Sequence, residues 1–128
     1  MPMGNVLGEF QFKSTSFTYS PGSDGAEIVA MNMEGSLDGP DGKLTALGTL
    51  TASPNADATR GTYTWLGRDF AADGSTRVST GGGFLKASGT GTWALRGYVS
   101  WSDGSAGAIE GELNLESRSL IGTACEWT

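Results

Sequence analysis

Asp-Gly pairs divide the chain into short segments, and the spacing of these turn signals constrains the fold more than any other feature of the sequence. The pairs lie at positions 24–25, 38–39, 41–42, 73–74 and 103–104. Asp-Gly is the strongest local signal for a tight β-hairpin, because both residues tolerate the positive φ angles of type I′ turns. The segments between the pairs have the two-residue alternation of β-strands. The sequence therefore predicts eight strands, near residues 7–19, 26–36, 43–53, 59–71, 75–86, 90–101, 106–116 and 118–125.

The chain lacks a sustained 3.6-residue period bounded by helix caps, so we expect an all-β protein. Eight strands joined mainly by hairpins predict an antiparallel meander. Closing this meander into a barrel pairs each strand on both sides and removes the exposed edges of an open sheet. We therefore predict one domain, residues 1–128, folded as a closed antiparallel β-barrel, with a two-sheet β-sandwich as the alternative.

Two segments share the template Gly-Thr-x-Thr-Trp-x-x-Arg-x-aromatic, at Gly61–Phe70 and Gly89–Tyr98. Side chains alternate along a strand, so the Trp and the Arg of each template point to opposite faces. In the second segment the Trp face continues with Leu95, Val99 and Trp101, and burial of this apolar face predicts that it lines the barrel interior. The last hairpin has the same partition, with Ile109, Gly111, Leu113 and Leu115 on one face and Glu110, Glu112, Asn114 and Glu116 on the other.

The predicted inner face is aromatic, and an eight-stranded barrel can hold one small ligand. The candidate ligand-binding residues are Tyr63, Trp65, Trp93 and Trp101. Gly67 and Gly97 share this face and are expected to leave space beside the rings, although simple core packing would also explain each Trp. Asp69 is the polar exception on this wall. If it is buried it could act as a general acid or base, whereas near a strand end it would contact water.

The arginines of the two templates, Arg68 and Arg96, lie on the opposite face. There they can form cross-strand ion pairs with the glutamates of 110–116. The same face also carries Leu66, Phe70 and Tyr98. These apolar side chains favour either a subunit interface, so that we expect a homo-oligomer, or the inverse assignment in which the arginines face the lumen.

The first predicted strand changes its alternation midway. Phe10 and Phe12 have one parity, and Phe17 and Tyr19 have the other. We therefore expect a bend or β-bulge around residues 13–16.

Composition excludes several classes of function. The chain has no His and a single Cys, Cys125, which removes Ser-His-Asp and Cys-His catalysis and imidazole-based metal sites, so we expect no metal and no cofactor. A net charge of −6 with only eight basic residues argues against binding nucleic acid or anionic membranes, and no apolar run is long enough to span a bilayer. The lone Cys fits a reducing compartment, and we expect a cytoplasmic location, with a trimmed signal peptide as the alternative.

The segment Ala87–Trp101, ASGTGTWALRGYVSW, resembles a strand of allene oxide cyclase-like and dirigent-like barrels, which carries Gly-Thr-Gly, an aromatic residue and then Ala-Arg-Gly-Tyr. This resemblance to a small bacterial member of that superfamily implies an eight-stranded barrel, often dimeric or trimeric. Its apolar lumen would cyclise or couple a reactive substrate without a cofactor. Alignment on the Trp places Trp93 in the lumen, whereas alignment on the Arg places Arg96 there; the hydrophobic pattern favours the first.

Three functions follow from these features. The first is a cofactor-free cyclase or isomerase that confines a small apolar substrate, with Asp69 transferring a proton and Arg96 stabilising an anion. The second is a non-catalytic carrier or sensor of a small apolar molecule, which uses the same wall. The third is a structural assembly module whose lumen is filled by side chains.

Overall fold

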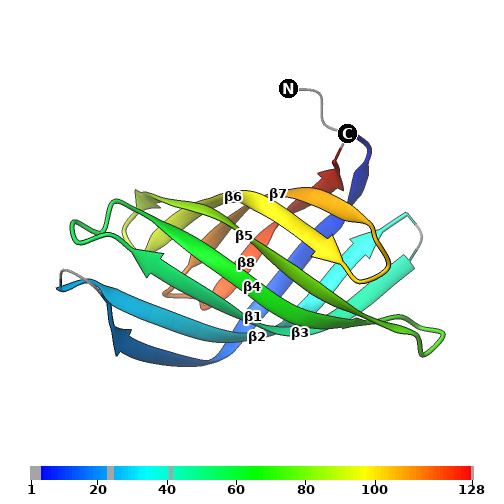
Figure 1. Ribbon diagram of the computed structural model, residues 1–128, viewed down its shortest axis with the longest axis horizontal. Helices are drawn as coiled ribbons and strands as arrows, with labels where there is room; N and C mark the ends of the chain where they lie inside the picture. The colour runs from blue at the N-terminus through cyan, green and yellow to red at the C-terminus, as the bar shows by residue number, and fades with distance from the viewer. Residues whose placement is uncertain (1–3, 23–24, 41, 128) are drawn as a thin grey trace.

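The computed structural model describes residues 4–22, 25–40 and 42–127, and these residues form one closed antiparallel β-barrel (Figure 1). The strands are β1 (Val6–Pro21), β2 (Glu27–Gly39), β3 (Gly42–Pro54), β4 (Arg60–Phe70), β5 (Thr76–Gly89), β6 (Thr92–Trp101), β7 (Ala106–Asn114) and β8 (Ser119–Glu126). Each strand pairs with the next along the chain, and β1 pairs with β8 to close the barrel. The prediction of an eight-stranded meander barrel is confirmed, and the sandwich alternative is wrong. No helix in this part of the chain is long and apolar enough to cross a membrane.

The Asp-Gly turns follow the backbone chemistry that predicted them. Gly74 and Gly104 have positive φ angles, which glycine adopts without a Cβ penalty. Asp73 accepts hydrogen bonds from the backbone N–H and the hydroxyl of Ser75, and Asp103 does the same for Ser105. These carboxylates therefore stabilise the turns.

The remaining Asp-Gly pairs behave differently. Gly39 belongs to β2 and pairs with Gly42 across the hairpin, so the pair at 38–39 lies just before the turn and does not form it. Asp24 and Asp41, from the other two pairs, lie outside the described residues, but Gly25 and Gly42 both have positive φ.

Alternation along the strands places one set of side chains inside the barrel. The least exposed large side chains are Met31 of β2, Leu50 of β3 and Leu95 of β6, which belong to a single apolar core. Burying a side chain of this size contributes roughly 1.5–3 kcal/mol. The core therefore supplies the main stabilisation of the barrel and fixes which face of each strand points inward.

Strand β1 contains the bulge that the sequence predicts. Its register with β2 shifts between Ser14 and Ser16. The extra residue restores the alternation, so that Phe10, Phe12, Phe17 and Tyr19 all pair with residues of one face of β2.

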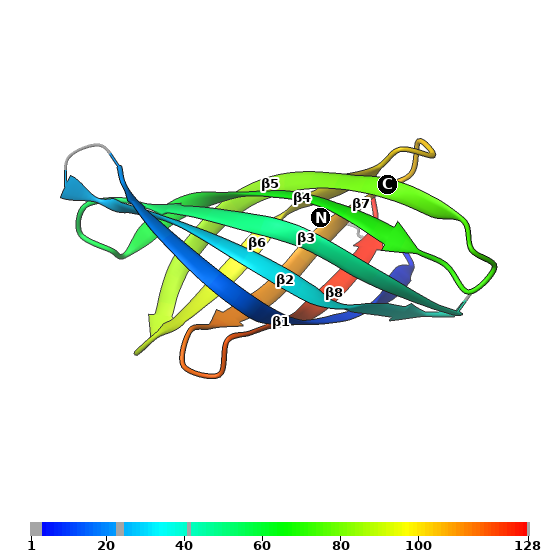
Figure 2. The same cartoon turned by 90° about the horizontal axis from the view of Figure 1, so that it is seen from below.

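β1 is also much longer than its second partner. It pairs with β2 as far as Pro21, but its pairing with β8 ends at Lys13, opposite Ser119. The end of the β1–β2 hairpin therefore projects beyond β8 at one end of the barrel (Figure 2).

Candidate functional site

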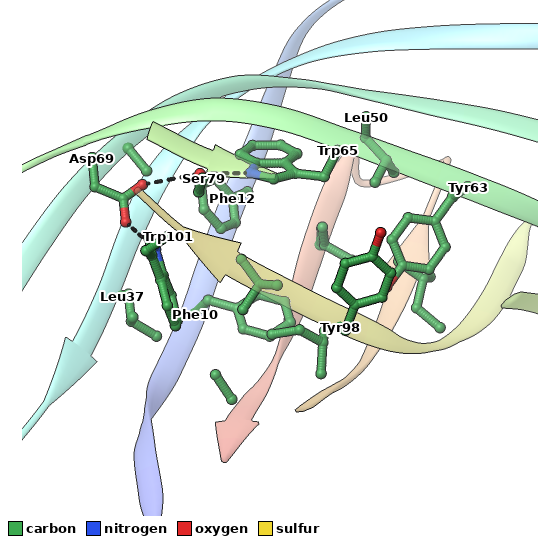
Figure 3. A pocket seen from close by; sticks show the side chains of 16 residues that line it. Phe10, Phe12, Leu37, Leu50, Tyr63, Trp65, Asp69, Ser79, Tyr98 and Trp101 are labelled. Carbon is green, nitrogen blue, oxygen red and sulfur yellow. Dashed lines mark hydrogen bonds between the residues drawn. The ribbon is translucent and has the colours of Figure 1, made fainter. Parts of the chain in front are cut away.

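The barrel interior contains a cavity of about 80 Å³ (Figure 3). Its wall is almost entirely apolar and comes from strands all around the barrel, with Phe10 and Phe12 of β1, Leu50 of β3, Leu95 of β6 and Leu120 of β8 among the lining residues. Four of the predicted site residues also line it: Tyr63, Trp65, Asp69 and Trp101. Figure 3 shows Asp69 and Trp101 together on one side of the cavity and Tyr63 on the other.

Asp69 is buried, and hydrogen bonds connect it directly to the indole of Trp101 and through Ser79 to the indole of Trp65. Its Oδ2 accepts a hydrogen bond from Trp101 Nε1 at 2.8 Å, and its Oδ1 accepts one from Ser79 Oγ at 3.3 Å. Ser79 Oγ in turn accepts a hydrogen bond from Trp65 Nε1 at 2.9 Å. The hairpin register explains this assembly, because Ser79 of β5 pairs with Trp101 of β6 and lies two residues from the partner of Asp69. The four side chains form one continuous polar network in an apolar wall.

Arg77 supplies the positive charge of this network. It pairs with Asp69 across the β4–β5 ladder, and its Nε lies 3.5 Å from Asp69 Oδ2. This separation suits an ion pair, although the buried Nε–H has no hydrogen-bond partner among the described residues. The guanidinium also lies 4.2 Å from the centroid of the Trp101 ring and forms a 3.1 Å ion pair with the exposed Asp103. Arg77 thus links the buried carboxylate to the surface turn and stacks on the indole.

The network limits what Asp69 can do chemically. Both of its oxygens already interact with protein donors, and its side chain is only 7% exposed. A substrate proton would have to displace one of these partners. The geometry therefore favours a structural role for Asp69 over the proton transfer that the sequence suggested.

Among the described residues that line the cavity, only Tyr63 has a buried side-chain polar atom, its hydroxyl oxygen, without a hydrogen-bond partner. Tyr63 pairs with Gly83 of β5, and Gly83 pairs with Gly97 of β6. Because neither glycine has a side chain, the phenol extends across both strands. A Cβ at Gly97 would collide with the Tyr63 hydroxyl. Burial raises the pKa of this hydroxyl to about 12, and the nearby Tyr98 adds to the rise. Tyr63 therefore remains a neutral phenol, able to donate a hydrogen bond, at any physiological pH.

Alkaline pH is expected to destabilise the protein through Tyr63. The unfolded chain releases the Tyr63 proton near pH 10, whereas the folded protein retains it to about pH 12. The raised pKa therefore leaves the free energy of unfolding unchanged below pH 10. Above pH 10 the free energy of unfolding falls, and the loss reaches about 2 kcal/mol as the pH approaches 12. Denaturant unfolding at about pH 9 and about pH 11.5 should show this loss in the wild type and a smaller loss in Tyr63→Phe. Tyr19→Phe, at an exposed tyrosine, is the control, and an equal loss in all three proteins would contradict the assignment.

The glycines of the inner face are covered by aromatic rings. A Cβ at Gly48 or Gly67 would meet the indole of Trp65, and one at Gly111 or Gly122 would meet the ring of Phe10. The sequence predicted empty space beside Gly67 and Gly97, and this prediction is wrong because Trp65 and Tyr63 occupy that space. The same packing explains why the cavity is small.

Two predicted site residues lie elsewhere. Trp93 faces inward, as its pairing with Leu113 shows, but it is only partly buried at the margin of the core and lies apart from the cavity lining. Arg96 points outward, with 79% of its side chain exposed, and forms a 3.1 Å ion pair with Glu110 of β7. The structure thus places Trp93 inside and Arg96 outside, and a lumenal role for Arg96 is excluded.

Sequence reasoning missed Ser79 and Arg77. The signal for Arg77 was available, because a hairpin centred on the turn at 73–74 places residue 77 opposite residue 69. Ser79 was harder to find, since only the register of three strands together reveals that it lies between two indoles.

The fold and the site define an eight-stranded meander barrel with a small apolar lumen. No family model, curated protein or solved structure matches the chain. The resemblance to allene oxide cyclase-like and dirigent-like barrels therefore stays a prediction from one strand.

Proposed function

We propose that this protein binds a compact apolar molecule with a single hydrogen-bond acceptor inside the barrel, as a carrier or sensor. The observation that carries the proposal is the buried Tyr63 hydroxyl, which has no hydrogen-bond partner among the described residues, on a residue that lines an apolar cavity. A buried polar group without a partner costs about 1–3 kcal/mol, and a ligand oxygen would remove that cost.

The size of the cavity selects the ligand. A protein cavity that binds benzene measures about 150 Å³, and the lumen here has a little over half that volume. A ligand of about five non-hydrogen atoms, such as a small ketone, suits this space after minor side-chain adjustment. Larger molecules would require displacement of Trp65 or Tyr63.

Cyclase or isomerase activity is the second candidate. It is favoured by the presence of two groups capable of proton transfer, Asp69 and the Tyr63 hydroxyl, in the wall of one cavity. The volume and the occupied oxygens of Asp69 favour binding without conversion. A filled structural module remains the outcome if the lumen takes no ligand.

Binding can be tested with a matched pair of probes, cyclobutanone and methylenecyclobutane, which have the same shape and differ in one acceptor. Trp65 and Trp101 line the cavity, so their fluorescence reports occupancy. We expect both probes to bind and the ketone to bind about fivefold more tightly, the effect of one net hydrogen bond. Tyr63→Phe should remove this preference while retaining hydrocarbon binding.

The outcomes of this experiment separate the candidates. If neither probe changes the fluorescence, ligand binding is refuted and the structural module is favoured. If both bind equally to the wild type, the lumen is a ligand site but Tyr63 does not select the ligand. Chemical conversion of a bound ketone, detected as deuterium exchange beside its carbonyl and lost in Asp69→Asn, would favour the enzyme.

A further inference from the structure

One strand of this closed barrel has a free edge. β1 continues from Ser14 to Pro21 beside β2, but β8 begins at Ser119, opposite Lys13. The last backbone hydrogen bond on that side runs from the Ser14 N–H to the Arg118 carbonyl, at 2.8 Å. Within the described residues, Ser16–Pro21 therefore has a strand partner on one side only, and Figure 1 shows this part of β1 at the border of the ribbon.

A groove of about 360 Å³ follows the free edge. It is lined by Ser14, Ser16, Phe17, Tyr19, Leu115 and Arg118. The rings of Phe17 and Tyr19 lie 6.4 Å apart, and 56% of the Tyr19 surface is exposed. The groove thus combines backbone that lacks a second strand partner with the apolar side chains of Phe17, Tyr19 and Leu115, and strand addition uses both features.

The β1 segment at this edge carries no charged side chain, and Arg118, which precedes β8, is the one charged residue among the described residues that line the groove. Natural edge strands are protected by lysines, prolines or short length. The sequence from Ser14 to Ser20 is STSFTYS, which is uncharged and rich in residues that favour strands, and Pro21 appears only at its end. In a chain with a net charge of −6, this segment is a place where two copies can approach without direct repulsion.

We propose that two copies of the chain form a homodimer by antiparallel pairing of their β1 edges, centred on Thr18. A two-fold axis through Thr18 pairs each residue with the partner residue whose number makes a sum of 36 with its own. Phe17 of each copy lies opposite Tyr19 of the other, and Ser16 lies opposite Ser20.

The self-complementarity of this segment is the reason to assign a second copy as the partner. Phe17 and Tyr19 flank Thr18 symmetrically and share one face of β1. A two-fold axis therefore brings four aromatic rings together on one side of the joined sheet, where cross-strand aromatic pairs are favourable. The contact is smaller than a standard interface of about 800 Å² per partner, so the dimer is reversible.

This interface differs from the one that the sequence suggested. The outward apolar residues beside Arg96 and Arg68 lie on β4 and β6, away from the edge of β1. The edge dimer also leaves the lumen and Tyr63 untouched, so it is independent of the proposed ligand binding.

Site-specific cross-linking tests the proposal. In a Cys125→Ser background, Thr18→Cys places two thiols opposite each other, at a Cα separation of about 4.5–5.5 Å that a disulfide can bridge. Thr64→Cys is the matched control, an exposed residue of β4 that is paired on both sides and lies beside the outward apolar face. Under mild oxidation, denaturing electrophoresis without reductant should show a covalent dimer of the Thr18→Cys protein and no covalent dimer of the Thr64→Cys protein.

Sedimentation of the unmodified chain supplies a second test. The wild type should approach the dimer mass at high micromolar concentration. Thr18→Lys should remove the dimer, because two like charges would face each other, while Thr64→Lys should leave it. A monomeric wild type, or a dimer lost only in Thr64→Lys, would overturn the edge pairing. Ligand binding by monomeric Thr18→Lys would remain normal, which separates this result from failure of the proposed function.

Discussion

Asp69→Ala is expected to lower the free energy of unfolding by about 4 kcal/mol. The substitution leaves Arg77 without its buried counter-ion and Trp101 Nε1–H without an acceptor. It also breaks the hydrogen bond from Ser79 and opens a small void beside two indoles. Loss of one partner of a buried ion pair costs about 3–5 kcal/mol, because the remaining charge stays desolvated. Denaturant unfolding monitored by tryptophan fluorescence measures the effect.

Two comparisons make the Asp69 result specific. Asp73→Ala removes an exposed turn carboxylate of the same strand-to-strand connection and should have a much smaller effect. The double variant Asp69→Leu/Arg77→Met removes the unpaired Arg77 charge and should recover the part of the loss that this charge causes, while Trp101 Nε1–H and Ser79 still lack their acceptor. If the free energy of unfolding of Asp69→Ala lies within about 1 kcal/mol of the wild-type value, the network does not stabilise the barrel.

Gly48→Ala is expected to destabilise the barrel by about 3 kcal/mol, because it adds a methyl group where no space exists. The new Cβ would collide with the six-membered ring of Trp65 and lie 2.8 Å from the Leu66 carbonyl oxygen. Trp65 cannot move freely, since its Nε1 is hydrogen-bonded to Ser79. The midpoint of denaturant unfolding should therefore fall sharply while the overall β-sheet signal is retained at low denaturant.

A matched glycine and a relieving substitution test this explanation. Gly89→Ala lies at the end of β5, where the added Cβ would meet only the hydroxyl of Thr92, a side chain that can rotate. It should change stability little. Trp65→Leu combined with Gly48→Ala should cost less than the sum of the single effects, because the smaller side chain leaves room for the methyl group. Additive losses would show that the Trp65 ring is not the cause.

The sequence predicted the fold well because its determinants are local. Turn chemistry marks the hairpins through Gly74 and Gly104, and two-residue alternation identifies the inner face. The bulge in β1 was predictable for the same reason, since Phe10 and Phe17 have opposite parity along one strand.

The site was predicted only in part because its properties depend on several strands at once. Alternation placed Asp69 among aromatics, but it could not show that Arg77 and Trp101 occupy its oxygens. It also treated inward glycines as empty space. The structure shows that a ring from a neighbouring strand position fills that space, as Trp65 does at Gly48 and Gly67.

The closure of the barrel determines how the chain can fold. Seven of the eight ladders join strands that follow one another along the chain, and only β1 with β8 joins distant segments. Successive hairpins can therefore form by zipping from their turns, with little loop entropy lost at each step. The β1–β8 ladder closes the barrel by pairing the two ends of the chain, and it contains a register shift between Val6 and Gly8. Folding kinetics should accordingly be governed by this seam, which assembles last and opens first.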